Sequence, residues 1–129
     1  MDKKNALQFR KLVYALQEDD GLTEAQEDFY EDYFLVCVDD ALRQYCYNNE
    51  RYNIIKGNAF IEVINDDNQK VCSYSHDKET EALQEIISRI DLAKLKNTDD
   101  VEAVFNDAVR EAVDWVVGHI YDLTHIEGI

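Results

Sequence analysis

The chain has 129 residues, which fits one domain that is large enough to bury its own core. Its formal net charge is −15, from 28 acidic and 13 basic residues, while its apolar share of 46% is that of an ordinary globular protein. Such an acidic surface excludes direct binding to nucleic acid or to an anionic membrane as the main activity, because both need clusters of lysine and arginine. We therefore expect a basic protein partner, whose association electrostatic steering would accelerate.

The N-terminal third predicts two helices. Residues 3–18 repeat apolar side chains at spacings of three and four, as one face of a helix requires. These side chains are Phe9, Leu12, Val13 and Leu16. Thr23 and Gln26 then have the spacing of a capping box, which predicts a longer helix over residues 24–47. Its apolar stripe is formed by Tyr30, Tyr33, Phe34, Cys37, Val38, Ala41, Leu42 and Tyr45.

The helical spacing of apolar residues ends at Asn48-Asn49. Three short segments rich in aromatic and β-branched residues follow. They are residues 52–56, 59–64 and 70–75. Gly57-Asn58 and the cluster at 65–68 have the composition of tight turns. We therefore expect two or three antiparallel strands in a small sheet, which must pack on the helices because an isolated hairpin is only marginally stable.

Two more helices are predicted after the strands. Asp77 can cap the first, whose apolar face is formed by Leu83, Ile86, Ile87 and Ile90. Thr98 or Asp99 can cap the second, a long helix over residues 99–124. The predicted class is therefore α+β, a single domain over residues 1–129 in the order α-α-β-β-β-α-α, with four main helices packed around the sheet.

The three cysteines give no sign of a disulfide framework, since their number is odd and their spacing is wide. They are Cys37, Cys46 and Cys72. Each falls in an apolar pattern, which favours reduced, buried thiols and a reducing cytoplasm. The N-terminus leads into no signal-type hydrophobic core, and no apolar run approaches the roughly 18 residues that span a bilayer.

Catalytic, cofactor and metal sites are not expected. No serine lies in a nucleophile-elbow pattern, and no glycine-rich phosphate loop is present. Cys72 and His76 have a spacing that suits a metal, but they lack two clear companions. The sequence Asp66-Asp67-Asn68 lacks the glycine and the terminal glutamate of a calcium loop.

Between Lys11 and Arg43 the chain has ten carboxylates and no lysine or arginine. Five of them recur at spacings of three and four along the predicted helix 24–47, so they share one face. This first acidic row consists of Glu24, Glu27, Asp28, Glu31 and Asp32. Carboxylates one helical turn apart lie about 5–6 Å from each other, close to the spacing of successive phosphates along a strand. The row therefore predicts a mimic of nucleic acid; a solvated face that serves only solubility is the alternative.

A second concentration of acids follows Asn97, where eight carboxylates stand against one base, Arg110. These eight are Asp99, Asp100, Glu102, Asp107, Glu111, Asp114, Asp122 and Glu127, and Asp100, Asp107, Glu111 and Asp114 share a face by helical spacing. The four that we expect to contact the partner are called the second acidic row: Asp99, Asp100, Glu102 and Asp107. Its early members could alternatively serve only as partners of the helix dipole. Tyr30 and Tyr33 lie inside the first acidic stretch and suit an interface, with the edge of the core as the alternative.

The middle of the chain also has a distinctive order of parts. The strand Ala59-Phe60-Ile61-Glu62-Val63-Ile64, the turn Asn65-Asp66-Asp67-Asn68 and the strand Lys70-Val71-Cys72-Ser73-Tyr74-Ser75 come first. The helix Glu81-Ala82-Leu83-Gln84-Glu85-Ile86-Ile87 and an acid-rich helix start that ends in Phe105-Asn106-Asp107 come next. In this order, residues 59–107 resemble the small phage-encoded type II anti-CRISPR proteins, which inhibit RNA-guided DNA nucleases.

The resemblance implies a DNA mimic. In that family, acidic residues occupy the cleft in which the nuclease reads its protospacer-adjacent motif with arginines. The positions of this sequence that match are Asp99, Asp100, Glu102, Asn106 and Asp107. This chain departs from the family because it has an additional helical pair over residues 3–47, ahead of the sheet. That pair carries the first acidic row, so the contact surface of this chain can differ from that of the family.

Together these features predict a non-enzymatic acidic binding protein that inhibits a nucleic-acid-handling enzyme by DNA mimicry. An anti-CRISPR that blocks an RNA-guided nuclease in the cytoplasm of the host bacterial cell is one such protein. Both acidic rows are expected to contact the partner. An immunity protein that neutralises a bacterial nuclease toxin is the alternative function. A structural or assembly subunit, whose acidity serves only solubility, is a third.

Overall fold

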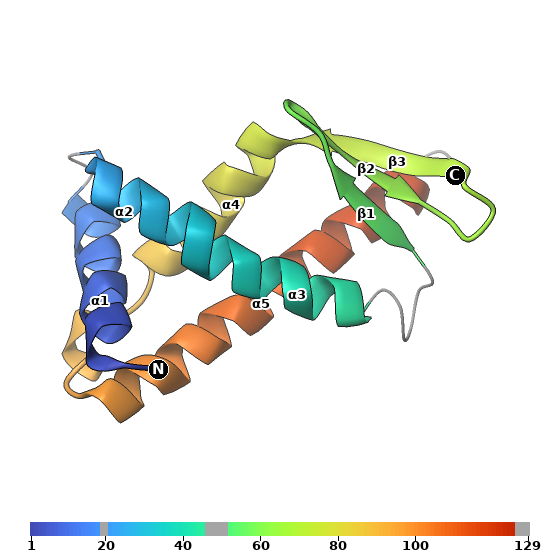
Figure 1. Cartoon of the computed structure of the whole chain (residues 1–129). Helices are drawn as coiled ribbons and strands as arrows, with labels where there is room; N and C mark the ends of the chain where they lie inside the picture. Colours follow the sequence, from blue (N-terminus) through green and yellow to red (C-terminus); the bar gives the residue numbers. More distant parts are fainter. Residues whose placement is uncertain (19–20, 46–51, 126–129) are drawn as a thin grey trace.

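The computed structural model describes residues 1–18, 21–45 and 52–125 (Figure 1). Its elements in chain order are α1 (Lys3–Glu18), α2 (Glu24–Phe29), η1 (Tyr30–Phe34), α3 (Leu35–Tyr45), β1 (Asn53–Lys56), β2 (Phe60–Ile64), β3 (Lys70–Ser75), α4 (His76–Ser88), η3 (Leu92–Lys94) and α5 (Thr98–His125). Because α2, η1 and α3 follow one another without a break, they form one long helix. The predicted α+β class and the order α-α-β-β-β-α-α are confirmed.

The long helix starts at the predicted capping box. The backbone N–H of Gln26 donates to Thr23 Oγ1 at 3.3 Å, and the backbone N–H of Thr23 donates to Gln26 Oε1 at 2.9 Å. Residues 46–47, at the predicted end of this helix, lie outside the described residues.

The segment η1 is a π-helical turn inside the long helix, which the sequence did not predict. The N–H of Leu35 donates to the carbonyl oxygen of Tyr30, a bond that spans five residues instead of four. The wider turn brings Phe29, Tyr30 and Phe34 into the core together. The acidic residues of α2 and η1, which lie before or between these three aromatic residues in the chain, consequently face the solvent.

An aromatic cluster joins α1, the long helix and α5. The ring of Phe105 meets the rings of Phe9 and Phe34 edge-on, with centroid distances of 5.1 Å and 5.6 Å. Tyr33 stacks on Phe29 at 5.0 Å and also contacts Phe105. Because these rings come from three separate helices, their burial fixes how the helices cross.

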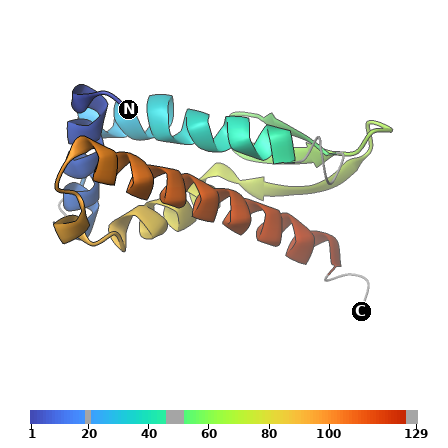
Figure 2. The same cartoon turned by 90° about the horizontal axis from the view of Figure 1, so that it is seen from below.

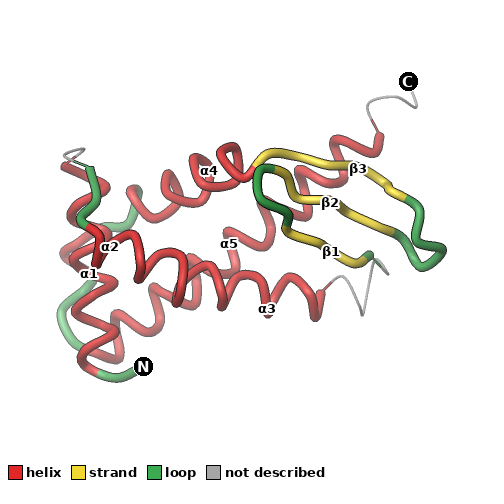
Figure 3. The backbone as a smooth tube through the Cα atoms, turned by 45° about the horizontal axis from the view of Figure 1, so that its top comes forward, coloured by secondary structure: helices red, strands yellow, loops and turns green. Residues whose placement is uncertain are grey.

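The sheet has the order β1-β2-β3, and both pairs are antiparallel (Figure 3). The turn between β2 and β3 is the predicted 65–68 cluster. Asn65 Oδ1 accepts hydrogen bonds from the N–H groups of Asp67 and Gln69, and Asn68 takes a positive φ of 59°, which asparagine tolerates better than most residues.

One face of the sheet is buried against α5. Ile61 and Val63 of β2 are fully buried, and the ring of Tyr74 on β3 contacts the ring of His119 on α5 at 5.3 Å. The helix α5 has 28 residues, so it is about 42 Å long. It therefore runs from the end of the molecule covered by α1 to the end covered by the sheet (Figure 1).

The helices form two layers, with α2, η1 and α3 in one and α4 and α5 in the other (Figure 2). Helix α1 crosses one end and contacts α2, α4 and α5. In the part of the chain that the structure describes, no helix is sufficiently long and apolar to cross a membrane.

Two predicted helix caps are wrong. Ser75, rather than Asp77, caps α4, and its Oγ accepts from the N–H of Lys78 at 3.2 Å. At the start of α5, Asn97 Oδ1 accepts from the N–H of Asp100 at 2.9 Å, so Asn97 takes the place expected for Thr98 or Asp99. In both cases the chain enters the helix earlier than expected, and the polar residue just before it becomes the cap.

Candidate partner-binding site

The first acidic row lies on the outer side of α2 and η1. All five of its side chains are exposed, while the opposite side of the same turns is held in the core by Phe29, Tyr30 and Phe34. Helical geometry and burial therefore place Glu24, Glu27, Asp28, Glu31 and Asp32 together on one surface, as predicted.

No base in the described part of the chain compensates this row. Within residues 1–18, 21–45 and 52–125, no lysine, arginine or histidine forms an ion pair with any of its five carboxylates. The carboxylates consequently repel one another at spacings of three and four residues, which costs a few tenths of a kcal/mol per pair. Their negative potential remains available to an external cation.

The second acidic row differs in its surroundings. Asp99 and Asp100 lie in the first turn of α5, where they complement the helix dipole. Glu102 Oε1 is 3.2 Å from the amino group of Met1, and Asp107 Oδ1 is 3.6 Å from Arg110 Nη1. Asn106, which the resemblance added to these positions, is exposed. Two of the four acids therefore already have a cation within the chain.

Further bases surround the second row. Asp100 shares a surface hollow with Lys94 and Lys96, and Asp107 shares another with Arg89 and Lys94. The row belongs to α5, in the layer opposite that of the first row (Figure 2). The structure therefore does not unite the two rows into one uncompensated anionic surface.

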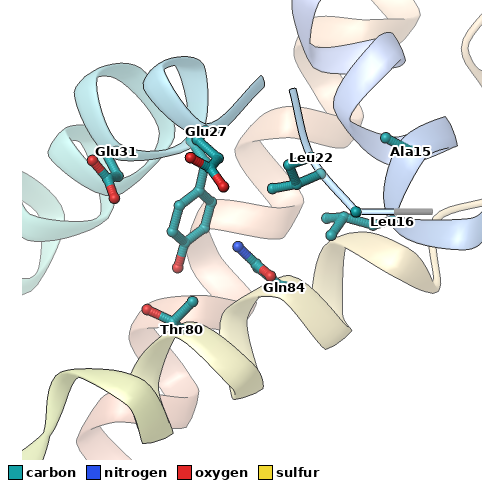
Figure 4. Close-up of a pocket in the computed structure, with 9 residues that line it drawn as sticks. Ala15, Leu16, Leu22, Glu27, Glu31, Thr80 and Gln84 are labelled. Atoms are coloured by element: carbon teal, nitrogen blue, oxygen red, sulfur yellow. The ribbon is translucent and has the colours of Figure 1, made fainter. Parts of the chain in front are cut away.

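A pocket of about 420 Å³ opens beside the first row (Figure 4). Three parts of the chain line it: the end of α1 with the residues after it, the α2–η1 turns, and α4. The lining residues are Ala15, Leu16, Gly21, Leu22, Glu27, Tyr30, Glu31, Thr80 and Gln84. Glu27 and Glu31 were among the contact residues predicted from the sequence. Thr80 and Gln84 are about fifty residues away in the chain and could not be associated with them.

Tyr30 is the buried polar residue of this pocket, with only 3% of its surface exposed. Burial raises the pKa of its hydroxyl, and the charges of Glu79, Asp39 and Glu31 raise it further. The side chain of Thr80 partly offsets this rise, yet the two groups do not meet in hydrogen-bond geometry, and the hydroxyl has no partner among the described residues. Tyr30 thus belongs to the core and is not an exposed surface side chain.

A second polar cluster lies between the layers. Lys56 Nζ on β1 is 2.7 Å from Asp39 Oδ1 on α3 and 3.0 Å from Glu79 Oε1 on α4. The hydroxyl of Tyr74 donates to Glu79 Oε2 at 3.4 Å. Glu79 is buried, and both of its carboxylate oxygens have partners in this cluster. The cluster joins the sheet to two helices and has a structural role.

The described cysteines are free thiols, as expected, but half-buried instead of fully buried. Burial raises the pKa of Cys37 and of Cys72, which keeps both thiols protonated at neutral pH. Cys46 lies outside the described residues. Among the described side chains, no group of three or more His, Cys, Asp or Glu residues could hold a metal ion.

Comparison with known proteins adds no relative: no protein family, no curated protein and no solved structure matches this chain.

Proposed function

We propose that this chain is an acidic binding protein that inhibits a nucleic-acid-handling enzyme by occupying its basic groove. The first acidic row is the contact surface. The single observation that carries the proposal is that five exposed carboxylates lie along one helical surface with no ion pair to any described base. A sequence that served only solubility could relieve this repulsion with one lysine, as the second row does with Arg110.

The mechanism is an exchange of anions. Arginines and lysines of the partner leave phosphate oxygens and bind the carboxylates, in charge-assisted hydrogen bonds. The row is held on a helix packed into the core, so its carboxylates need little reorganisation on binding. Affinity falls as salt rises, but less steeply than for a duplex, because a folded protein condenses fewer counterions than DNA does.

The test begins with affinity capture from a bacterial lysate at low and high salt, followed by a displacement assay on the captured enzyme. A fluorescent duplex is bound to that enzyme, and its anisotropy is followed as the acidic protein is added. We expect stoichiometric displacement of the duplex by the native chain. The double variant Glu24→Lys/Asp28→Lys should lose this displacement by at least about a hundredfold, since each reversed contact costs about 1.5–3 kcal/mol.

The matched control is Asp66→Lys/Asp67→Lys, which makes the same change in net charge at the exposed turn between β2 and β3. It should displace the duplex nearly as well as the native chain. Equal loss in both variants would show that only net charge matters, and unchanged displacement by the first variant would contradict the proposed surface. Assaying an RNA-guided nuclease and a toxin nuclease side by side separates the anti-CRISPR and immunity forms of the proposal.

A further inference from the structure

The pocket beside the first acidic row has the chemistry of a cation site. Among the described residues, its charged lining residues are Glu27 and Glu31, and no described lysine, arginine or histidine lines it. Figure 4 shows Glu27 and Glu31 along one wall and Thr80 and Gln84 along the opposite wall, on α4. An anionic ligand is therefore excluded by charge, whereas a cation would meet two carboxylates and several neutral acceptors.

The third wall is apolar. Ala15, Leu16 and Leu22 lie on this side (Figure 4). A cation on an alkyl stem, such as a guanidinium or a primary ammonium, could place its methylene groups against these side chains and its charged end against the carboxylates. The volume of about 420 Å³ lies within the range of small-ligand pockets.

The hydroxyl of Tyr30 supplies an independent indication of a ligand. A buried polar group without a hydrogen bond destabilises a protein, and phenylalanine would fill the same space without this cost. Tyr30 lines the pocket, and its hydroxyl lies beside Thr80, another lining residue. An N–H donor from a bound ligand would satisfy the oxygen that the described residues leave without a partner.

From these observations we infer that the pocket lined by Glu27, Glu31 and Tyr30 receives one arginine or lysine side chain of the protein partner. The inference rests on the proposed function, which supplies a basic partner. It adds an anchor to what would otherwise be a purely electrostatic surface: the head group binds Glu27 and Glu31, its stem packs on Leu16 and Leu22, and an N–H donates to the Tyr30 hydroxyl.

The test uses the isolated protein and needs no partner. The probes are N-acetyl-arginine amide and N-acetyl-lysine amide, with N-acetyl-citrulline amide as the uncharged isostere of the first and free agmatine as a non-peptide cation. Binding is followed by amide chemical shifts, and we expect a dissociation constant of about 1 mM for the arginine probe, equivalent to about −4 kcal/mol. Leu22, Thr80 and Gln84 should shift, and the citrulline probe should bind at least about tenfold more weakly. Agmatine binding as tightly as the peptide probes would assign the pocket to a free amine instead of a partner side chain.

Two double variants separate the pocket from the surrounding charge. Glu27→Gln/Glu31→Gln should weaken binding of the arginine probe by about tenfold or more. Asp66→Asn/Asp67→Asn removes the same two charges at the exposed turn between β2 and β3, and neither residue lines the pocket or belongs to the first acidic row, so it should change binding by less than about twofold. Equal weakening in both variants, or no saturable binding of any cation, would overturn the inference.

Tyr30→Phe gives a second, independent readout. The variant should be at least as resistant to urea as the native chain, because it removes an unsatisfied buried group, yet it should bind the arginine probe several-fold more weakly. Unchanged affinity would remove the hydroxyl from the site and overturn the inference. Failure of these probes would leave displacement of the duplex by the first acidic row unaffected, so the outcomes of the two proposals can be told apart.

Discussion

Lys56 is the shared cation of two carboxylates that belong to different helices. Its ammonium group lies between Asp39 on α3 and Glu79 on α4, both within 3.0 Å, and its own side chain is 20% exposed. One cation thus holds two partly or fully buried carboxylates from different layers. Removing a partner from a buried ion pair destabilises a protein strongly, because the remaining charge stays desolvated.

Lys56→Met should therefore lower the free energy of unfolding by about 3 kcal/mol, since it leaves Asp39 and Glu79 next to each other without a cation. Urea unfolding followed by circular dichroism measures the change. Lys70→Met is the matched control. Lys70 is exposed, and its Nζ lies 4.0 Å from Glu62, so this loss should stay below about 1 kcal/mol. A similar small loss for both variants would show that Lys56 does not stabilise the two carboxylates.

This cluster also shows what the sequence could not predict at the residue scale. Glu79 lies in the first turn of α4, where a carboxylate usually complements the helix dipole. It instead turns inward to Lys56, 23 residues earlier in the chain. Nothing in the local pattern of hydrophobic and polar residues indicates such a pairing, because it depends on where β1 lies relative to α3 and α4.

At the scale of elements, the residue at which a helix begins sets the direction of the acidic side chains along it. Thr23 begins α2 with a capping box, and Asn97 precedes α5 with a side-chain hydrogen bond to Asp100. Both caps satisfy backbone N–H groups that have no partner inside the helix. The helix that carries each acidic row therefore begins at a defined residue.

Asn97→Ala should lower the free energy of unfolding by about 1 kcal/mol, the usual loss when an N-cap is replaced by alanine. Thr98→Ala should have less than half of this effect, because Thr98 is already within α5. Thermal and urea unfolding of the two variants test the assignment. A larger loss for Thr98→Ala would restore the cap expected from the sequence.

How well each helix, strand or pocket could be predicted depends on how strong its signal is in the local sequence. The bounds of α1 and β3 were predicted to the residue, because apolar periodicity and turn residues agree there. The π turn of η1 was missed, since a helix with one wide turn has almost the same apolar spacing as an ordinary one. The pocket was missed because α1, α2 and α4 meet there only in the folded chain.

At the scale of the whole molecule, charge and layering act together. The net charge of −15 is carried by a chain of 129 residues, so like charges are closer together in the folded state than in the unfolded chain. Self-repulsion of this kind destabilises the compact state. The two acidic rows lie in opposite layers, which limits the repulsion between them.

Salt should therefore stabilise the isolated protein. Raising NaCl from about 20 mM to about 200 mM shortens the Debye length from about 20 Å to about 7 Å. We expect the free energy of unfolding in urea to rise by about 1 kcal/mol over this range. The variant Asp66→Lys/Asp67→Lys, whose net charge is −15 + 4 = −11, should gain less. A fold that loses stability over the same range would depend more on ion pairs such as that of Lys56 than on relief of repulsion.

The junction between β3 and α4 affects how the pocket would meet a ligand. Ser75 ends the strand and caps the helix, so no loop residue separates the two elements. The backbone N–H of the next residue, His76, donates to the carbonyl oxygen of Ala59 at 3.1 Å, and its Nε2 lies 2.7 Å from the carbonyl oxygen of Gly57. The helix that carries Thr80 and Gln84 is therefore joined to the sheet without a flexible connection. Its orientation is already fixed in the free protein, and the loss of conformational entropy on association is correspondingly small.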